Sequence, residues 1–196
     1  LLVGLDNIWT EAKGESKSNA TQNNVAAFGS LNFIQRKFNA VLAVRQEMVD
    51  HDLAPFSPCL SAEYEFIKDL SVLGNVNYNF RYPSLNDKYW TVGGNPDLLP
   101  EQGWNGEAGL RYHAKNFEVQ ATYYNQSIEN FIQWVPVSGV IWSPQNVKKV
   151  AIKGLETSLK YAFAIGKTKF GIDLGYLFNN SIVKESEAEK KQIVWD

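Results

Sequence analysis

The side chains of this chain that could carry out catalysis or bind a metal are few and scattered. The chain has two histidines, His51 and His113, and one cysteine, Cys59, and none of them has a second ligand at a spacing typical of a metal site. No Ser-His-Asp or Cys-His arrangement is supported, because neither histidine lies in a catalytic motif. The acidic run at residues 185–191 lacks the oxygen spacing of a calcium loop. We therefore expect no enzyme activity, no metal and no cofactor.

Aromatic side chains in the polar segments are better suited to binding, because flat ligands stack on aromatic rings. We assign candidate ligand contacts to six residues in or beside these segments: Arg81, Tyr82, Tyr89, Trp90, Trp134 and Trp142. The alternative, which the sequence favours for the aromatic ones, is that they pack their own loops or form an aromatic belt at a membrane surface.

Alternation of apolar and polar residues dominates the rest of the chain. From Leu60 to Phe66 and from Leu70 to Phe80, most alternate positions are apolar and the positions between them are mainly Ser, Asn or Glu. Because successive side chains of a strand point to opposite faces, each segment has one apolar and one polar face. Similar runs predict about nine strands, at residues 1–12, 25–35, 38–48, 59–66, 70–81, 104–112, 117–124, 155–161 and 170–178. The prediction is an all-β, antiparallel up-and-down meander.

The connections between these strands alternate in length. Tight turns are expected at residues 36–37, 68–69, 114–115 and 166–167. Longer polar links are expected at residues 13–24, 82–101, 135–146 and 179–191, with a shorter one at 50–58. Transmembrane barrels have this asymmetry, with short periplasmic turns and longer extracellular loops.

The composition of each face favours a membrane barrel over a soluble one. Aromatic residues such as Phe33, Phe38, Tyr112 and Phe117 flank the tight turns, where a membrane barrel carries its interfacial girdle. The polar face is rich in Asn, Ser, Gln, Thr and Gly, whereas Lys and Glu predominate on a solvent-exposed face. We expect its sparse charges to face the lumen or a domain inside it: Arg45, Glu63, Glu65 and Arg111. Arg45 and Glu63 are expected to pair with each other across the 50–58 link.

Several classes are excluded by what the sequence lacks. The formal net charge is -2 and no basic stripe stands out, so we expect no nucleic-acid partner. No apolar run is long enough for a membrane-spanning helix, and the first residues do not resemble a signal peptide. Both ends look like interior points of a repeating pattern, so we expect the chain to be cut from a longer one.

Two motifs resemble the barrel signature of TonB-dependent outer-membrane receptors. Residues 79–90 read NFRYPSLNDKYW and residues 93–101 read GGNPDLLPE, which match a strand ending in Phe-Arg-x-Pro-Ser-Leu, a loop, and Gly-Asn-Pro-x-Leu-x-Pro-Glu. Residues 146–156 read NVKKVAIKGLE and match the same family's Asn-x-x-x-x-x-Ile-x-Gly-Leu-Glu strand. We assign loop-shaping and strand-shaping roles to the residues of these motifs: Pro83, Asn95, Pro96, Pro100, Glu101, Gly154 and Glu156. Gly154 is expected at a bulge or kink where the strand curves around the barrel, and Glu101 is expected to accept hydrogen bonds from loop backbone.

The resemblance implies a transporter in the outer membrane of a Gram-negative bacterium. Residues 1–196 would be a partial transmembrane domain of about nine strands from a 22-stranded barrel, without the plug domain and the remaining strands. Implied partners are outer-membrane lipid, the protein's own plug domain, the TonB complex through an N-terminal region, and a small-molecule ligand. That ligand would be a metal chelate or a cobalamin, and the motif spacing favours the cobalamin-type subgroup.

Two alternatives remain open at this point: a soluble all-β ligand-binding module and an outer-membrane barrel enzyme. For an isolated segment we expect self-association, because two unpaired sheet edges and a large apolar face would be exposed.

Overall fold

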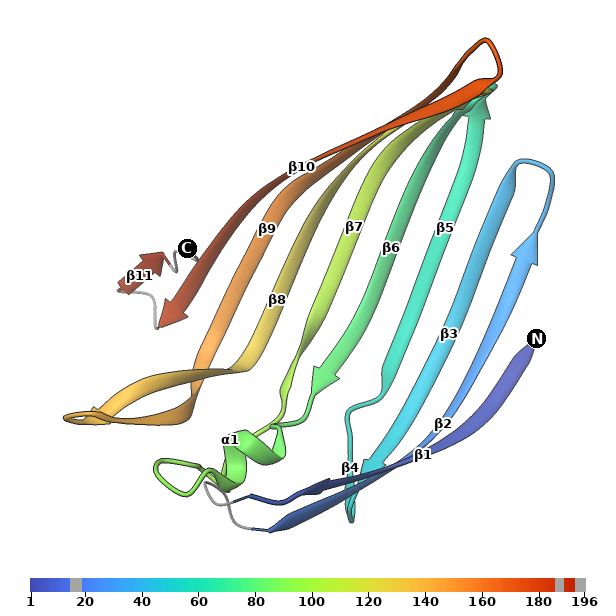
Figure 1. Cartoon of the computed structure of the whole chain (residues 1–196). Coiled ribbons are helices and arrows are strands. Elements are labelled where there is room, and N and C mark those ends of the chain that lie inside the picture. The colour runs from blue at the N-terminus through green and yellow to red at the C-terminus, as the bar shows by residue number, and fades with distance from the viewer. Residues whose placement is uncertain (15–18, 186–188, 193–196) are drawn as a thin grey trace.

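One antiparallel sheet makes up almost the whole of the computed structural model, which describes residues 1–14, 19–185 and 189–192. The strand order is β1-β2-β3-β5-β6-β7-β8-β9-β10-β11, with the short β4 paired to β3 (Figure 1). The strands are β1 Leu2–Ala12, β2 Ala20–Ile34, β3 Phe38–Val49, β4 Asp52–Leu53, β5 Ser57–Ile67, β6 Leu70–Arg81, β7 Glu101–Ala114, β8 Phe117–Ser138, β9 Ile141–Ile165, β10 Thr168–Glu185 and β11 Glu189–Gln192. Nine of them are long, so the predicted all-β meander is confirmed.

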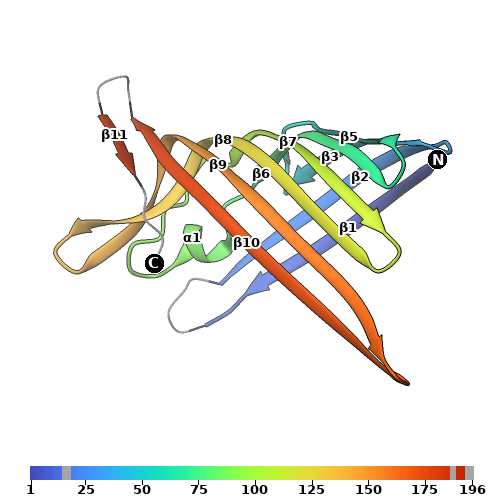
Figure 2. The same ribbon diagram turned by 90° about the horizontal axis from the view of Figure 1, so that it is seen from above.

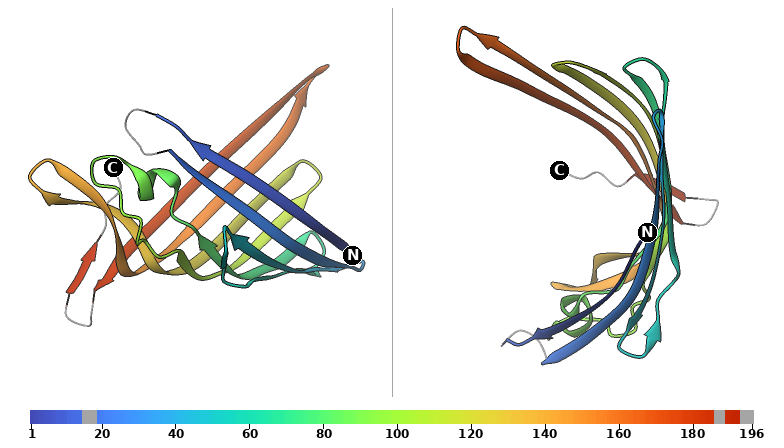
Figure 3. Two further views of the ribbon diagram at one scale, coloured as in Figure 1. Left: turned by 90° about the horizontal axis from the view of Figure 1, so that it is seen from below. Right: turned by 90° about the vertical axis from the view of Figure 1, so that its right-hand side faces the viewer.

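The sheet is bent into a trough, as part of a barrel wall would be. Seen from above and from the side, the strands follow an arc, and the helix α1 (Leu85–Tyr89) lies on its concave side (Figures 2 and 3). The register places Asn77 of β6 opposite Asn105 of β7, and Val76 opposite Leu60 of β5. Polar and apolar residues therefore form separate rows on the two faces, as the alternation predicts.

The apolar face of the sheet is left exposed. Large apolar side chains such as Leu42, Leu60, Leu110 and Leu174 are between 48% and 60% exposed. The buried side chains instead include Ala26, Leu85, Leu98, Ile132 and Val150, several of which lie in or near the long loops. A soluble domain buries such a face, whereas lipid covers it in a membrane barrel.

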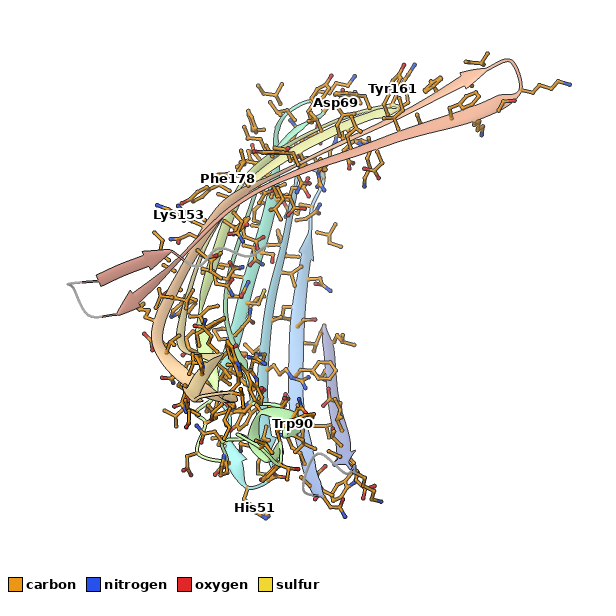
Figure 4. All side chains as sticks on the ribbon, turned by 60° about the vertical axis from the view of Figure 1, so that its left-hand side comes forward. His51, Asp69, Trp90, Lys153, Tyr161 and Phe178 are labelled. Atoms are coloured by element: carbon orange, nitrogen blue, oxygen red, sulfur yellow. The ribbon has the colours of Figure 1, made fainter. Side chains whose placement is uncertain are left out.

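The tight turns lie together at one end of the trough. Asp69 and Lys115 adopt positive φ values of 64° and 39° there, and Gly166 has a φ of 60°. Figure 4 labels Asp69 and Tyr161 at this end, with His51 and Trp90 at the opposite end. Aromatic rings on the apolar face pair beside the turns: Phe33 with Phe38, Tyr112 with Phe117, and Phe163 with both Tyr161 and Phe170.

Three of the predicted long links are shorter than expected. Strands β8 and β9 run through the expected 135–146 link to a tight turn at Gly139, so the prediction of a loop there is wrong. Beyond residue 129, β8 pairs with β9 alone, and this two-stranded ribbon tolerates Pro136 and Pro144, because proline is accepted where no neighbouring strand needs its N–H. Strand β2 starts at Ala20 within the expected 13–24 link, and β10 and β11 pair within the 179–191 link. Residues 15–18 and 186–188 of these two links lie outside the described residues.

The 82–101 link contains the helix α1, which the alternation did not predict. Among the described residues, no helix has the length and apolar character needed to cross a bilayer.

Candidate functional site

A polar recess of about 350 Å³ lies on the concave face, beneath the start of the 82–100 loop. Side chains from β2, β3, β5, β6 and the loop line it: Gln22, Asn24, Arg45, Glu47, Ser57, Asn79, Phe80, Tyr82, Pro83 and Ser84. The polar faces of these strands point toward the recess, so amide and hydroxyl groups predominate over apolar carbon in its lining. We call this cavity the mouth recess.

Arg45 is the cation of the mouth recess, and its charge is neutralised by two carboxylates. Its guanidinium donates to Asp6 Oδ2 at 2.9 Å and Oδ1 at 3.2 Å, and to Glu47 Oε2 at 2.9 Å. Asn24 completes the cluster by donating to Glu47 Oε1 at 2.9 Å. The expected pair between Arg45 and Glu63 is wrong, because the register sets Arg45 opposite Ser57.

Glu63 instead forms an ion pair with Arg111 on β7, deeper in the trough. The two side chains line a second cavity of about 330 Å³, which we call the deep recess. Its other lining residues are the polar Asn39, Ser61, Asn75 and Gln120 and the small or apolar Ala40, Val41, Ala62, Leu73 and Gly74. Glu65 lies closer to the tight turns and accepts a hydrogen bond from the backbone N–H of Asp69 at 3.2 Å. Arg45, Glu63 and Arg111 thus line recesses on the polar face, whereas Glu65 stabilises a turn.

Glu101 fastens the outer end of β6 to the β8–β9 ribbon. Its carboxylate accepts from Arg81 Nε at 2.7 Å and Nη2 at 2.8 Å, and from the backbone N–H of Ile132 at 2.7 Å. Glu101 thus accepts a hydrogen bond from the backbone, but the donor belongs to strand β8 and not to a loop as expected. Arg81 also lines a smaller cavity of about 210 Å³ beside this pair. Because its guanidinium is bound to Glu101, Arg81 links the outer ends of β6 and β7.

The helix α1 is fixed above the recess by Asp87. Ser84 and Asp87 form a capping box, in which Asp87 N–H donates to Ser84 Oγ at 3.1 Å and Ser84 N–H donates to Asp87 Oδ2 at 3.0 Å. Trp134 Nε1 also donates to Asp87 Oδ1 at 3.0 Å. Burial raises the pKa of Asp87, but the hydrogen bonds from Ser84 and Trp134 and the charge of Arg81 together lower it below its ordinary 3.8.

The remaining motif residues connect the 82–100 loop to the ribbon. Asn95 Nδ2 donates to the Pro144 carbonyl at 3.1 Å, and Asn146 bonds both the N–H and the carbonyl of Leu99, at 2.8 Å and 3.0 Å. The Pro100 carbonyl accepts from Asn130 Nδ2 at 3.3 Å. Pro83 is fully buried, and Pro96 lies between Asn95 and Asp97, where the Asn95 side chain accepts from the Asp97 N–H.

Gly154 has a different role from the one expected. The pairing of β9 with β8 and β10 continues through Gly154 without a register shift, so the predicted bulge is wrong. A Cβ at this position would collide with the Phe178 carbonyl oxygen and the Tyr124 ring, so glycine is needed for close approach of the Tyr124 side chain. Glu156, two residues further along, is exposed on the same face.

The structure separates the six predicted ligand contacts. Tyr82 lines the mouth recess, where burial first and then the nearby carboxylates of Asp52, Glu47 and Asp50 raise its pKa, so its hydroxyl keeps its proton. Trp134 serves as a hydrogen-bond donor to Asp87, and Arg81 as a partner of Glu101. Tyr89, Trp90 and Trp142 are more than a third exposed and do not line the recess.

The amides and hydroxyls of the mouth recess were missed by the sequence analysis. Gln22, Asn24 and Ser57 lie in segments that were predicted as links, so the alternation gave no signal for them. Asn79 is the first residue of the 79–90 motif and lies on the polar parity of its strand. His51 and His113 lie at opposite ends of the trough, and among the described residues no group of three His, Cys, Asp or Glu side chains could hold a metal ion.

The family to which this wall belongs is decided by one match. A model described as "TonB dependent receptor-like, beta-barrel" matches residues 3–192. The chain belongs to this family. It is therefore a segment of an outer-membrane β-barrel, and the resemblance noted in residues 79–101 and 146–156 is confirmed.

Individual relatives agree with this membership. The chain is 32% identical over 122 residues to the vitamin B12 transporter BtuB of Photobacterium profundum, covering 60% of this chain and 20% of the relative. A solved structure of the siderophore receptor PirA from Pseudomonas aeruginosa superposes with a TM-score of 0.74 at 18% identity, covering 92% of this chain and 40% of that one. The copper transporter OprC superposes with a TM-score of 0.70 at 16% identity, covering 90% and 34%. The chain thus spans about a fifth of the curated relative's length, and these matched proteins are transporters or receptors.

Proposed function

We propose that this chain is the wall segment of a TonB-dependent transporter that imports a scarce small molecule across the outer membrane, and that the molecule is a cobalamin-type ligand. Membership of the receptor barrel family over residues 3–192 carries the transporter proposal. The vitamin B12 transporters among the relatives, one of them 33% identical over 85 residues, support the ligand class. We assign no catalytic role to any side chain.

The mouth recess fits the first contact of such a ligand. It lies on the concave face below the loop-bearing end, which is the extracellular end if the short turns are periplasmic, as in other transmembrane barrels. Its amides and hydroxyls can bond a ligand rich in carboxamides, while Arg45 is already neutralised by Asp6 and Glu47. In the proposal the plug domain closes the lumen below this recess, and TonB supplies the energy.

Uptake by the full-length protein tests this function. In cells that lack their own cobalamin transporter, expression should restore uptake of radiolabelled cyanocobalamin, and deletion of TonB should abolish it. Asn24→Leu should weaken binding, because it removes an amide of the recess, whereas Asn32→Leu, on the same face of β2 but outside the recess, should not. Uptake that persists without TonB would refute the proposal.

The exposed apolar face carries a second proposal, that this segment requires lipid or its own copies to hide that face. Light scattering of residues 1–196 should give a defined species in detergent, and oligomers joined through the apolar face or the sheet edges without it. A stable, β-rich monomer in plain buffer would overturn this second proposal.

A further inference from the structure

Three asparagines of β6 form a continuous row of hydrogen bonds along the concave face. Asn79 Nδ2 donates to Asn77 Oδ1 at 2.6 Å, and Asn77 Nδ2 donates to Asn75 Oδ1 at 2.5 Å. Asn75 Nδ2 donates in turn to Ser61 Oγ on β5 at 2.5 Å. We call Asn75, Asn77 and Asn79 the amide ladder. Each amide keeps hydrogen-bonding capacity beyond its ladder bonds, because an amide has two donors and an acceptor with two lone pairs.

The amide ladder joins the two recesses described above. Asn79 lines the mouth recess, and Asn75 and Ser61 line the deep recess, whereas Asn77 lies between them and lines neither. At a rise of about 3.4 Å per residue, the four steps from Asn79 to Asn75 span about 14 Å along the strand. Asn105 stands opposite Asn77 on β7 and widens the neutral surface at this level.

Arginines above and below this level are paired with carboxylates, whereas Glu107, which stands opposite Asn75 on β7, accepts a hydrogen bond from the neutral Asn105 amide at 2.9 Å. Arg81 and Glu101 pair at the outer end, Arg45 pairs with Asp6 and Glu47 at the mouth recess, and Arg111 pairs with Glu63 at the deep recess. In the described strands, therefore, each of these three arginines forms an ion pair with at least one carboxylate. An anionic ligand would have to displace one of these carboxylates, whereas a neutral ligand could exchange hydrogen bonds with the amides.

We infer that the amide ladder is the surface along which a neutral, carboxamide-bearing or hydroxyl-bearing ligand moves from the mouth recess to the deep recess. This inference rests on the proposed transport function and adds the route and the residues that select the ligand. Each step along Asn79, Asn77 and Asn75 exchanges one neutral amide hydrogen bond for another of similar strength, and the Glu107 carboxylate opposite Asn75 repels an anionic ligand. Asn77 is the ladder residue between the two recesses.

Uptake and binding by Asn77 variants of the full-length transporter test the route. Asn77→Leu should lower the maximal rate of cyanocobalamin uptake by about tenfold and leave the surface affinity within about threefold, because the mouth recess is intact. Asn77→Gln, which keeps the amide, should restore most of the rate. Asn32→Leu is the matched control. It removes an amide on the same face of the sheet that belongs neither to the ladder nor to a recess. Heat-modifiable migration on gels should confirm that every variant forms the barrel.

Two probes separate the failure of this inference from the failure of the proposed function. The wild-type protein is assayed with cyanocobalamin, which is neutral at the periphery and rich in carboxamides, and with ferric enterobactin, which is anionic. If the protein takes up neither ligand, the transport function is overturned, and this inference with it. Uptake of ferric enterobactin alone leaves a transporter but overturns the neutral route. Uptake of cyanocobalamin that is insensitive to Asn77→Leu, or equally sensitive to Asn32→Leu, also overturns the route and leaves the transport function standing.

Discussion

The two ends of the trough are stabilised by different interactions. At the short-turn end, aromatic rings stack on the apolar face, as Phe163 does with Tyr161 at 5.6 Å and with Phe170 at 5.3 Å between ring centroids. At the long-loop end, hydrogen bonds and ion pairs centred on Asp87, Glu101 and Asn146 hold the loop over the concave face. Stacked rings suit a rim at headgroup depth, whereas directional polar bonds suit a loop in water that must keep one shape above a binding recess.

Removing the Asp87 carboxylate should have the largest effect, and should affect the long-loop end alone. Asp87→Ala removes the carboxylate that accepts from the Ser84 N–H in the capping box and leaves Trp134 Nε1 without its acceptor, so local stability should fall by about 2–4 kcal/mol. Trypsin cleavage at Lys88 in the folded barrel measures the opening of the loop. Asp97→Ala, an exposed carboxylate of the same loop, is the matched control, and equal cleavage of both variants would contradict this role.

Acid should loosen the same loop more gently. Because the pKa of Asp87 in the folded protein lies below its ordinary 3.8, the carboxylate stabilises the loop fully above that value and loses its contribution as the pH falls through the lower, folded pKa. Hydrogen exchange at the Asn95 amide, which donates to the Asp87 carbonyl at 2.9 Å, should accelerate below pH 3.8 after correction for intrinsic rates. In Asp87→Asn this pH dependence should vanish; its persistence would assign the effect to another group.

The stacked rings at the other end should contribute less. Phe163→Leu keeps an apolar side chain but loses two ring contacts, and should lower the stability of the barrel by about 1–2 kcal/mol. Urea unfolding in lipid vesicles measures the change. The control is Phe178→Leu, on the same face but in none of the aromatic pairs found in the described part of the chain. Similar losses in both variants would mean that lipid contact, and not stacking, is what Phe163 supplies.

The smallest effect is expected from an exposed ion pair of the ribbon. Lys149 Nζ lies 3.5 Å from Glu129 Oε1, and both side chains are about half exposed. Lys149→Ala should therefore change stability by about 0–1 kcal/mol in the same urea assay, and high salt should reduce the difference further. A loss comparable to that of Phe163→Leu would show that exposed charges matter more at the long-loop end than the polar bonds around Asp87 suggest.

The sequence predicted the membrane-facing part of this fold well, because alternation is a local property. The pattern around Leu60 to Phe80 placed two strands, their turn and both faces correctly. Partners across the sheet could not be predicted, because a register shift of one or two residues changes every pair. Arg45 therefore has Asp6 and Glu47 where Glu63 was expected. The 135–146 segment was misread because its prolines and polar residues are typical of loops, although a ribbon with two free edges tolerates them.

The hydrogen bonds between residues 82–100 and the β8–β9 ribbon also limit how the loops at the mouth of this barrel can be re-engineered and how they can diverge in evolution. Asn95, Asn130 and Asn146 each bridge the two segments through backbone groups, so neither segment keeps its conformation if the other is exchanged alone. A chimaera that grafts a new ligand specificity onto this scaffold must therefore transplant both segments as one cassette.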